Sequence, residues 1–305
     1  MSDRRTFLTQ LTASALLGGM PLTARAITMT QPAKLISRVI PSSGEALPVI
    51  GMGTSRTFDV ADDPAALKPL AEVLRALVDG GATLIDSSPM YGKAEAVTGR
   101  LLLDLGQPRV FAATKVWADG KEAGIRQMEE SLRLLGVARM DLMQIHNLRD
   151  WRTQLATLRS WKESGRIRYL GITTSRKEQY EEFAAVMRSE SLDFVQLNYS
   201  LGEREAERVL LPLARDRGMA VLVNRPYMRG ELFSRVRGRP LPDWAGEIDC
   251  VTWGQLFMKF IVAHPAVTCV IPATTSVANL RDNLAGGIGR LPDEPLRQRM
   301  IAALA

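Results

Sequence analysis

Strand-like and helical segments alternate along almost the whole chain, and this alternation restricts the fold more than any other feature. Short apolar runs typical of buried parallel strands are each followed by a segment with the periodicity of an amphipathic helix. The predicted strands cover residues 50–54, 82–86, 110–115, 140–146, 168–173, 194–199, 219–224 and 267–271. The predicted helices cover residues 65–79, 94–105, 122–135, 152–164, 177–188, 204–217, 244–263 and 276–285.

Repeated strand–helix units require a parallel sheet whose outer faces are covered by helices. Eight such units after residue 50 favour an α/β fold of the (β/α)8 TIM-barrel type. An open doubly wound sheet is the alternative, but the turn after the first strand, Gly51-Met52-Gly53-Thr54-Ser55-Arg56, lacks the third glycine of a dinucleotide-binding motif. We also expect an N-terminal β-hairpin at the barrel floor, residues 35–50, and an accessory C-terminal helix, residues 293–304.

The first 26 residues have the features of an export signal. Arg4-Arg5 precedes a weakly apolar segment, and Ala24-Arg25-Ala26 follows as a small-x-small cleavage site. This order resembles a twin-arginine signal, with a frayed helix and two chance arginines as the alternative. We therefore expect two regions, a signal peptide at 1–26 and the barrel at 27–305. The expected partner is the twin-arginine export machinery, and the expected location is the periplasm after cleavage near Ala26.

Charge, hydropathy and cysteine content argue against nucleic acid, a membrane or a metal ion as partners. The formal net charge is +6, and no basic run is interleaved with aromatic residues, so nucleic acid is not an expected partner. After the signal segment no stretch is apolar enough for a membrane span, so stable membrane insertion is not expected. The two cysteines, Cys250 and Cys269, lack metal-ligand spacing, and buried thiols are favoured over a disulfide. No metal site is predicted.

Chemically versatile side chains stand at or just after the ends of three successive predicted strands. Asp86 ends one strand and Tyr91 follows five residues later, Lys115 ends the next strand, and His146 ends the third. In a TIM barrel these ends meet at one mouth. A nearby cation lowers the pKa of a tyrosine, so we expect Lys115 to do this for Tyr91 while Asp86 keeps the ammonium charged. His146 would hydrogen-bond a substrate oxygen. The site would protonate a carbonyl oxygen, while the hydride must come from a cofactor.

These residues and the segments around them resemble the aldo/keto reductase family. The resemblance covers nearly all of the chain after the signal segment and rests on residues 51–54, 84–92, 110–115, 141–146, 171–173, 196–199 and 271–272. It implies a TIM barrel that reduces an aldehyde or ketone to an alcohol, or catalyses the reverse oxidation, with NADP(H) and less often NAD(H). It also implies that Tyr91 is the general acid, that Lys115 and Asp86 tune it, and that His146 orients the carbonyl.

The resemblance also implies where the cofactor binds. Asp86 would lie near the nicotinamide ribose, Gln196 near the carboxamide, and residues 226–235 around the pyrophosphate. Residues 271–276, with Leu280 and Asn283, would surround the adenosine. The implied cofactor-binding residues are Gly53, Thr54, Asp86, Thr173, Gln196, Asn224, Arg225, Pro226, Arg229, Gly230, Leu232, Arg235, Ile271, Ala273, Thr274, Asn279 and Asn283.

The sequence departs from the family pattern around both ends of the expected cofactor. Thr174 stands where an asparagine often clamps the carboxamide, and Asn224 stands where an aromatic ring often stacks on the nicotinamide, with Tyr227 as a substitute three residues later. Ala273 and Asn279 stand where a lysine and an arginine often bind the 2′-phosphate. Arg281 is then the remaining candidate cation, and the preference for NADPH is weaker than the family pattern implies.

Two other functions fit parts of the pattern. A lysine at a strand end can form a Schiff base, so Lys115 is also compatible with an aldolase or lyase. A non-catalytic barrel that only binds the nucleotide is the third interpretation. Trp117 is either a wall of the substrate pocket or exterior packing, whereas His264 is expected at a helix end without a chemical role. We expect a small-molecule carbonyl substrate, whose identity depends on the loops at 54–63, 117–122, 147–151 and 225–243. No motif defines an oligomeric state.

Overall fold

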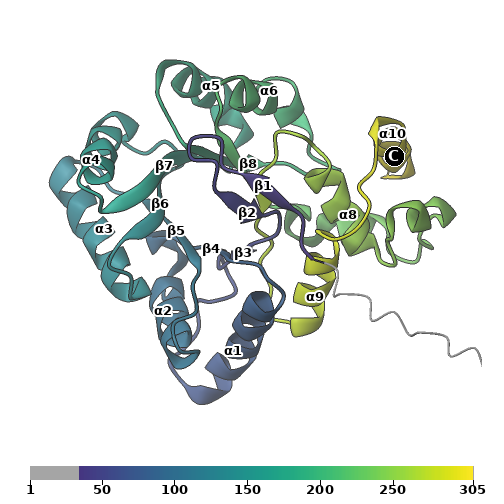
Figure 1. Cartoon of the computed structure of the whole chain (residues 1–305), viewed down its shortest axis with the longest axis horizontal. Coiled ribbons are helices and arrows are strands. Elements are labelled where there is room, and N and C mark those ends of the chain that lie inside the picture. The colour runs from purple at the N-terminus through teal and green to yellow at the C-terminus, as the bar shows by residue number, and fades with distance from the viewer. Residues whose placement is uncertain (1–33, 305) are drawn as a thin grey trace, which may run out of the picture. The chain divides into compact units, whose positions relative to one another are not determined.

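Eight parallel strands form one sheet in the computed structural model, which describes residues 34–304. They are β3 (Met52–Gly53), β4 (Leu84–Asp86), β5 (Phe111–Val116), β6 (Met140–His146), β7 (Ile167–Thr173), β8 (Phe194–Asn198), β9 (Ala220–Asn224) and β10 (Cys269–Val270). Each strand pairs with the next in chain order, and an isolated parallel bridge between Ile50 and Val270 joins the two edges. A Cβ added at Gly53 would lie 3.0 Å from the carbonyl oxygen of Ile271, so the absence of a side chain at Gly53 allows the two edges of the sheet to approach closely. The TIM-barrel prediction is confirmed and the open sheet is wrong (Figure 1).

Helices surround the sheet on its outer face (Figure 1). They are α1 (Pro64–Asp79), α2 (Ala94–Asp104), α3 (Lys121–Leu135), α4 (Trp151–Glu163), α5 (Tyr180–Ser189), α6 (Leu210–Asp216), α8 (Trp253–Val262) and α9 (Val277–Ala285), while the short α7 (Glu231–Arg235) lies in the long loop after β9. The first helix illustrates the local rules. Asp63 caps it by accepting the amides of Ala65 and Ala66, each at 3.0 Å, and Pro64 occupies its first turn. None of the helices within 34–304 is long and apolar enough to cross a membrane.

Two predicted helices are shorter than their apolar periodicity indicated. In the predicted helix 204–217, a 3₁₀ turn at Glu205–Glu207 is followed by α6, because Val209 has φ −136° and interrupts the helix. The predicted helix 244–263 is divided into a 3₁₀ segment, Asp243–Ile248, and α8, because Asp249 has a left-handed φ of 56°. Both pieces still bury apolar side chains. The periodicity therefore reports which residues face the core and does not report backbone continuity.

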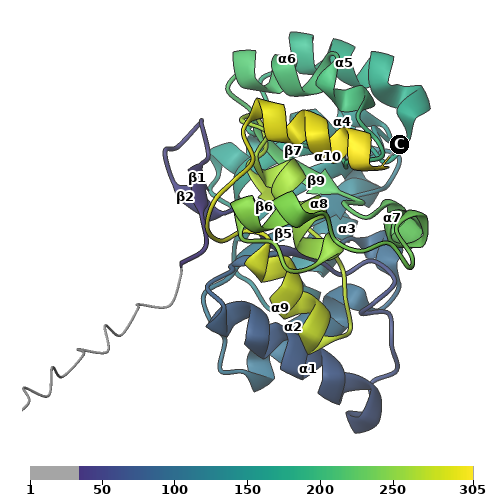
Figure 2. The same cartoon turned by 90° about the vertical axis from the view of Figure 1, so that its right-hand side faces the viewer.

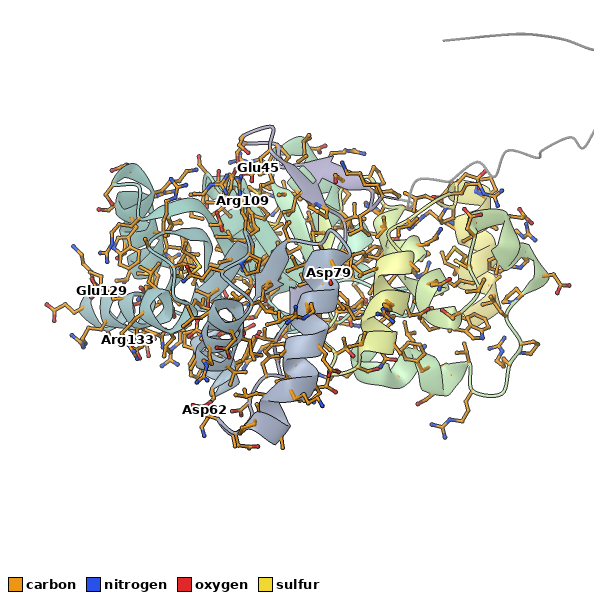
Figure 3. The ribbon with its side chains drawn as sticks, turned by 60° about the horizontal axis from the view of Figure 1, so that its bottom comes forward. Glu45, Asp62, Asp79, Arg109, Glu129 and Arg133 are labelled. Carbon is orange, nitrogen blue, oxygen red and sulfur yellow. The ribbon has the colours of Figure 1, made fainter. Side chains whose placement is uncertain are left out.

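A hairpin of β1 (Ser37–Val39) and β2 (Ala46–Pro48) closes the amino-terminal end of the barrel (Figure 2). Its Ile40 and Leu47 join the interior cluster, whose other members come from the barrel strands or directly follow β10: Leu84, Phe111, Ala113, Leu142, Tyr169, Phe194, Ala220, Leu222, Cys269 and Ile271. At the same end the Tyr169 hydroxyl lies 2.7 Å from the Glu45 carboxylate. Figure 3 shows Glu45 beside the hairpin and Asp62, in the loop after β3, at the opposite end. The predicted floor hairpin is confirmed.

The predicted accessory helix is α10 (Glu294–Leu304), which packs outside the barrel. Its buried Arg297 donates to the Tyr199 hydroxyl at 2.8 Å and to the Glu207 carboxylate at 2.9 Å. Cys250 and Cys269 are both buried and free, as expected for structural thiols. The predicted signal segment, residues 1–26, lies outside the described residues.

Candidate active site

Lys115 and Asp86 form a buried ion pair at the carboxyl ends of β5 and β4. The Lys115 Nζ lies 2.5 Å from Asp86 Oδ2 and 2.8 Å from the carbonyl oxygen of Ser87, and Gln144 Nε2 donates to Asp86 Oδ1 at 3.2 Å. Burial alone would lower the pKa of Lys115, but the charge of Asp86 and the adjacent Tyr91 raise it above its ordinary value. Lys115 is therefore an ammonium, and a Schiff base requires the neutral amine. This state of Lys115 disfavours the lyase interpretation.

Tyr91 ends a 3₁₀ turn, Pro89–Tyr91, directly after β4, and it is half-buried. Its ring centroid lies 5.2 Å from the Lys115 Nζ. Burial raises the pKa of Tyr91 more than the charge of Lys115 lowers it, so the net shift is upward. The expected net lowering is therefore wrong, because withdrawal of the phenol from water outweighs the attraction of the ammonium. The consequence is a protonated phenol at neutral pH, which has a proton to donate.

His146 ends β6 and completes the predicted constellation. Its ring centroid lies 5.9 Å from that of Tyr91, with the two rings nearly perpendicular. Its Nδ1 lies 3.0 Å from the hydroxyl of Ser88, which is fully buried. Burial, assisted by the charge of Lys115, lowers the pKa of His146 to about 3. The imidazole is therefore neutral at neutral pH, and it can donate a hydrogen bond but cannot act as a charged acid.

Amide groups at or near the ends of three strands are suited to a nicotinamide. Gln144 Oε1, Gln196 Nε2 and Asn224 Oδ1 are buried and have no hydrogen-bond partner among residues 34–304. Such atoms are costly unless a ligand satisfies them. A carboxamide supplies both a donor and an acceptor, so Gln196 and Asn224, which are both predicted cofactor residues, fit this group. Asn224 also donates through Nδ2 to the carbonyl oxygen of Thr174 at 3.3 Å, which fixes the end of β9 against the loop after β7.

The loop after β9 carries two arginines in a tight turn with several positive φ values. Arg225, Met228 and Arg229 have positive φ values of 50°, 50° and 59°, and Gly230 follows with 96°. Within this turn the backbone N–H groups of Met228 and Gly230 donate to the carbonyl oxygens of Arg225 and Tyr227 at 2.9 and 2.8 Å, so the candidate anion ligands are the arginine side chains. Burial lowers the pKa of Arg225, and the positive charges of Arg229 and Arg56 lower it further. Arg56, in the loop after β3, was not predicted as a site residue, although it directly follows the Gly-Thr-Ser segment that ends the first strand.

Other predicted cofactor residues are engaged within the protein. Arg235 forms an ion pair with Glu231 on α7. The Tyr227 hydroxyl lies 2.5 Å from Asn283 Oδ1, and its ring packs 4.8 Å from that of Phe233. The Tyr227 ring is held in an aromatic cluster and its hydroxyl is directed to α9, and its role as the stacking substitute stays a prediction.

The remaining cofactor candidates lie near the carboxyl ends of the strands and at the start of α9. Gly53 ends β3 and Thr54 follows it, with the Thr54 hydroxyl 2.9 Å from Ser87 Oγ, and Thr173 ends β7. The other members of the predicted set are Pro226 and Leu232, both buried in the loop after β9, Ile271, Ala273 and Thr274 between β10 and α9, and Asn279 in the first turn of α9. Ala273 and Asn279 are exposed, as is Arg281. This placement leaves the exposed Arg281 as a cation near the predicted adenosine end.

Trp117 follows β5 at the same end of the barrel as Lys115, and its ring is half-buried. The Arg149 guanidinium lies 4.1 Å from the indole centroid and 2.5 Å from the Asp119 carboxylate. The loops after β5 and β6 therefore hold the tryptophan in place at this end of the barrel, and both interpretations of its role stay open. Within residues 34–304 no group of three or more His, Cys, Asp or Glu side chains has the geometry to hold a metal ion.

A parallel barrel with a phenol, a buried lysine–aspartate pair and a neutral imidazole at its carboxyl end defines a class, the barrel oxidoreductases that act on carbonyl groups. The chain belongs to the aldo/keto reductase family, whose sequence profile matches residues 49–298. It is therefore an NAD(P)H-dependent oxidoreductase that reduces carbonyl compounds.

Three known proteins illustrate the similarity. The chain is 27% identical over 256 residues to methylglyoxal reductase YeaE of Escherichia coli (strain K12), covering 81% of this chain and 88% of that protein. It is 29% identical over 197 residues to the NADH-specific methylglyoxal reductase of the same organism, covering 54% of this chain and 58% of that protein. The structure of an aldo-keto reductase from Klebsiella pneumoniae in complex with NADPH superposes with a TM-score of 0.72 at 24% identity, covering 90% and 96% of the two chains.

Proposed function

We propose that this chain reduces a small aldehyde, of which 2-oxoaldehydes such as methylglyoxal are the first candidates, with Tyr91 as the proton donor. The names of the two Escherichia coli relatives support the substrate class. The observation that carries the role of Tyr91 is the protonated phenol beside the buried Lys115–Asp86 pair. Trp117, and Met90 with 42% of its surface exposed, border the same mouth and supply apolar walls for a small substrate.

Each residue of the site has a separate role in the reduction. When bound, the nicotinamide supplies the hydride. Tyr91 donates its phenolic proton to the carbonyl oxygen, and the Lys115 ammonium stabilises the phenolate that forms. Asp86, held by Gln144, keeps Lys115 charged and in place. The neutral ring of His146 donates a hydrogen bond to the carbonyl oxygen and so aligns the carbonyl with Tyr91.

We propose that the cofactor is NADP(H), with NAD(H) accepted. Gln196 and Asn224 would bind the carboxamide, and the loop from Arg225 to Gly230 together with Arg56 would bind the pyrophosphate. The relatives include one NADH-specific enzyme and one structure that contains NADPH. Because the adenosine end of this chain carries Ala273 and Asn279, selection of the 2′-phosphate depends on Arg281.

The test is turnover by the purified chain from residue 27 onward, followed by loss of nicotinamide absorbance with methylglyoxal and with larger aldehydes and ketones. We expect turnover with small aldehydes and a large loss in Tyr91→Phe. Tight nucleotide binding without turnover of any carbonyl would favour a non-catalytic barrel. Covalent trapping of a carbonyl substrate on Lys115 by borohydride would favour the lyase instead.

We further propose that residues 1–26 direct twin-arginine export and that the mature enzyme acts in the periplasm. Arg4-Arg5, the weakly apolar segment and Ala24-Arg25-Ala26 support this proposal. Export of a folded chain suits an enzyme whose cofactor is made in the cytoplasm. Replacing Arg4-Arg5 with Lys-Lys should retain the protein in the cytoplasm, and denaturing the periplasmic wild type should release bound nucleotide. Export that ignores the substitution contradicts the signal, and an empty periplasmic enzyme contradicts export with the cofactor.

A further inference from the structure

The hydroxyl of Ser88 connects the turn that carries Tyr91 to the ring of His146. Ser88 is fully buried and caps the 3₁₀ turn Pro89–Tyr91, where its Oγ accepts the backbone N–H of Met90 at 3.2 Å. The same Oγ lies 3.0 Å from His146 Nδ1. One oxygen atom thus contacts both the backbone beside the acid and the imidazole.

The donor in the contact between Ser88 Oγ and His146 Nδ1 follows from which of the two groups can supply a hydrogen. A serine hydroxyl has one hydrogen to donate, and the amide of Met90 can only donate, so it does not accept that hydrogen. Among residues 34–304, His146 Nδ1 is the acceptor within hydrogen-bond distance of the Ser88 hydroxyl. If Nδ1 carried a hydrogen, the buried hydroxyl would have no acceptor in this part of the chain, which is a costly arrangement.

We propose that Ser88 is a positioning residue that holds His146 in the tautomer with hydrogen on Nε2. The ring then presents an N–H donor on the side opposite Ser88. The use of this donor for the substrate carbonyl oxygen rests on the proposed function, whereas the tautomer itself does not. The turn that carries Tyr91 also fixes the Ser88 hydroxyl. The same turn therefore positions Tyr91 and selects the tautomer of His146.

Two further observations make this inference measurable. Burial lowers the pKa of His146 to about 3, so the ring is neutral at neutral pH and its tautomer is well defined. The chain contains only two histidines. The other one, His264, accepts the backbone N–H of Ala266 through Nδ1 at 3.2 Å, so it too must carry its hydrogen on Nε2. His264 therefore provides an internal reference for the same tautomer.

The direct test is nitrogen NMR of the protein labelled with ¹⁵N-histidine, with His264→Gln used to assign the two rings. At neutral pH we expect both rings to give the pattern of a neutral imidazole protonated on Nε2. In Ser88→Ala we expect the His146 signals to move toward a mixture of tautomers while those of His264 stay in place. A wild-type His146 protonated on Nδ1, or a His146 pattern that ignores Ser88→Ala, overturns the proposal. This measurement requires no turnover.

Kinetics test the consequence for catalysis. Ser88→Ala should lower kcat/KM for the carbonyl roughly tenfold, about the rate equivalent of one net hydrogen bond, with the Kd of the nucleotide unchanged. Ser88→Thr, which keeps a hydroxyl, should recover most of the loss. The matched control is Ser164→Ala, which removes a hydroxyl bonded to the Trp161 carbonyl at the end of α4. Normal reduction by Ser88→Ala overturns the positioning role, whereas the expected tautomer in a wild type that reduces no carbonyl overturns the proposed function alone.

Discussion

The Lys115 Nζ and Asp86 Oδ2 atoms lie 2.5 Å apart, and the two side chains are 0% and 3% exposed, so bulk water solvates neither charge. Burying two charges costs more than their attraction returns unless further hydrogen bonds satisfy them. Ser87 and Gln144 provide those bonds. The pair therefore contributes little net stability, and the proton transfer proposed for Tyr91 would give it a function.

The first prediction separates the structural and chemical roles of this pair. Lys115→Met should destabilise the protein by about 3–5 kcal/mol, because it leaves a buried carboxylate unpaired. Adding Asp86→Asn should recover much of that stability without restoring reductase activity. Denaturant unfolding measures the first effect and aldehyde turnover the second. Equal stability of the single and double variants would contradict the electrostatic explanation. Any residual activity of Lys115→Met should shift its pH profile upward, since the phenolate loses its cation.

The second prediction concerns the acid. Tyr91→Phe should reduce kcat by roughly 10²–10⁴-fold or more, because it removes a positioned proton donor. The Kd of the nucleotide should change little, because the amide and arginine groups assigned to the cofactor are untouched. Fluorescence titration gives the Kd, and single-turnover kinetics give the chemical step. A parallel loss of nucleotide binding would mean that Tyr91 acts through the structure of the site.

The third prediction concerns acid stability. Burial lowers the pKa of His146 to about 3 and that of His264 to about 4, against an ordinary value of about 6.5. As the pH falls from about 6.5 toward 4, the unfolded chain binds protons at these residues and the folded chain does not. The free energy of unfolding should therefore fall, by up to about 1.4 kcal/mol per pH unit for each histidine.

Urea unfolding at a series of pH values measures this slope, and His264→Gln isolates one histidine. The variant should lose less stability than the wild type between about pH 6.5 and pH 4. Identical slopes in the two proteins would show that His264 does not contribute.

The fourth prediction concerns cofactor choice. With Ala273 and Asn279 at the adenosine end, the preference for NADPH over NADH should stay below about 100-fold, or about 2.7 kcal/mol. Ala273→Lys with Asn279→Arg should increase it. The ratio of kcat/KM for the two cofactors is the measurement. A wild-type preference above that limit that disappears in Arg281→Ala would identify Arg281 as a sufficient cation.

The fifth prediction tests the arginine that sequence reasoning missed. Arg56→Ala should raise the Kd for NADPH and NADH by similar factors, roughly threefold to tenfold, because both cofactors contain the pyrophosphate. The effect should shrink at high salt. Arg139→Ala is the matched control, since Arg139 is exposed and lies just before the amino end of β6, whereas the candidate site lies at the carboxyl ends of the strands. A loss confined to NADPH would place Arg56 at the 2′-phosphate instead.

The fold and the grouping of the candidate site residues could be predicted from the sequence, because in a barrel the order of the strands along the chain fixes where their ends lie. Once Asp86, Lys115 and His146 were recognised at the ends of successive strands, their meeting at one mouth followed from topology. Gln144 could have been found by the same logic, since it lies two residues before His146 and therefore faces the same side of β6.

Other features depended on quantities that the sequence does not carry. The direction of the Tyr91 pKa shift is set by how much water the fold removes, and no motif states this. The orientation of Tyr227 results from a loop with several positive φ values and from an aromatic partner on α7. Local propensity describes neither, so tertiary packing decided both.

The hairpin at the barrel floor has a consequence for how this enzyme can be altered. Ile40 and Leu47 pack against the interior side chains at one end, while the groups assigned to the reaction stand at the other. Changes to the hairpin should therefore shift the thermal tolerance of the enzyme and leave its choice of aldehyde alone, whereas changes to the mouth loops should retune that choice. Directed evolution could work on the two ends as separate modules, with a thermostable scaffold selected first and substrate range broadened afterwards.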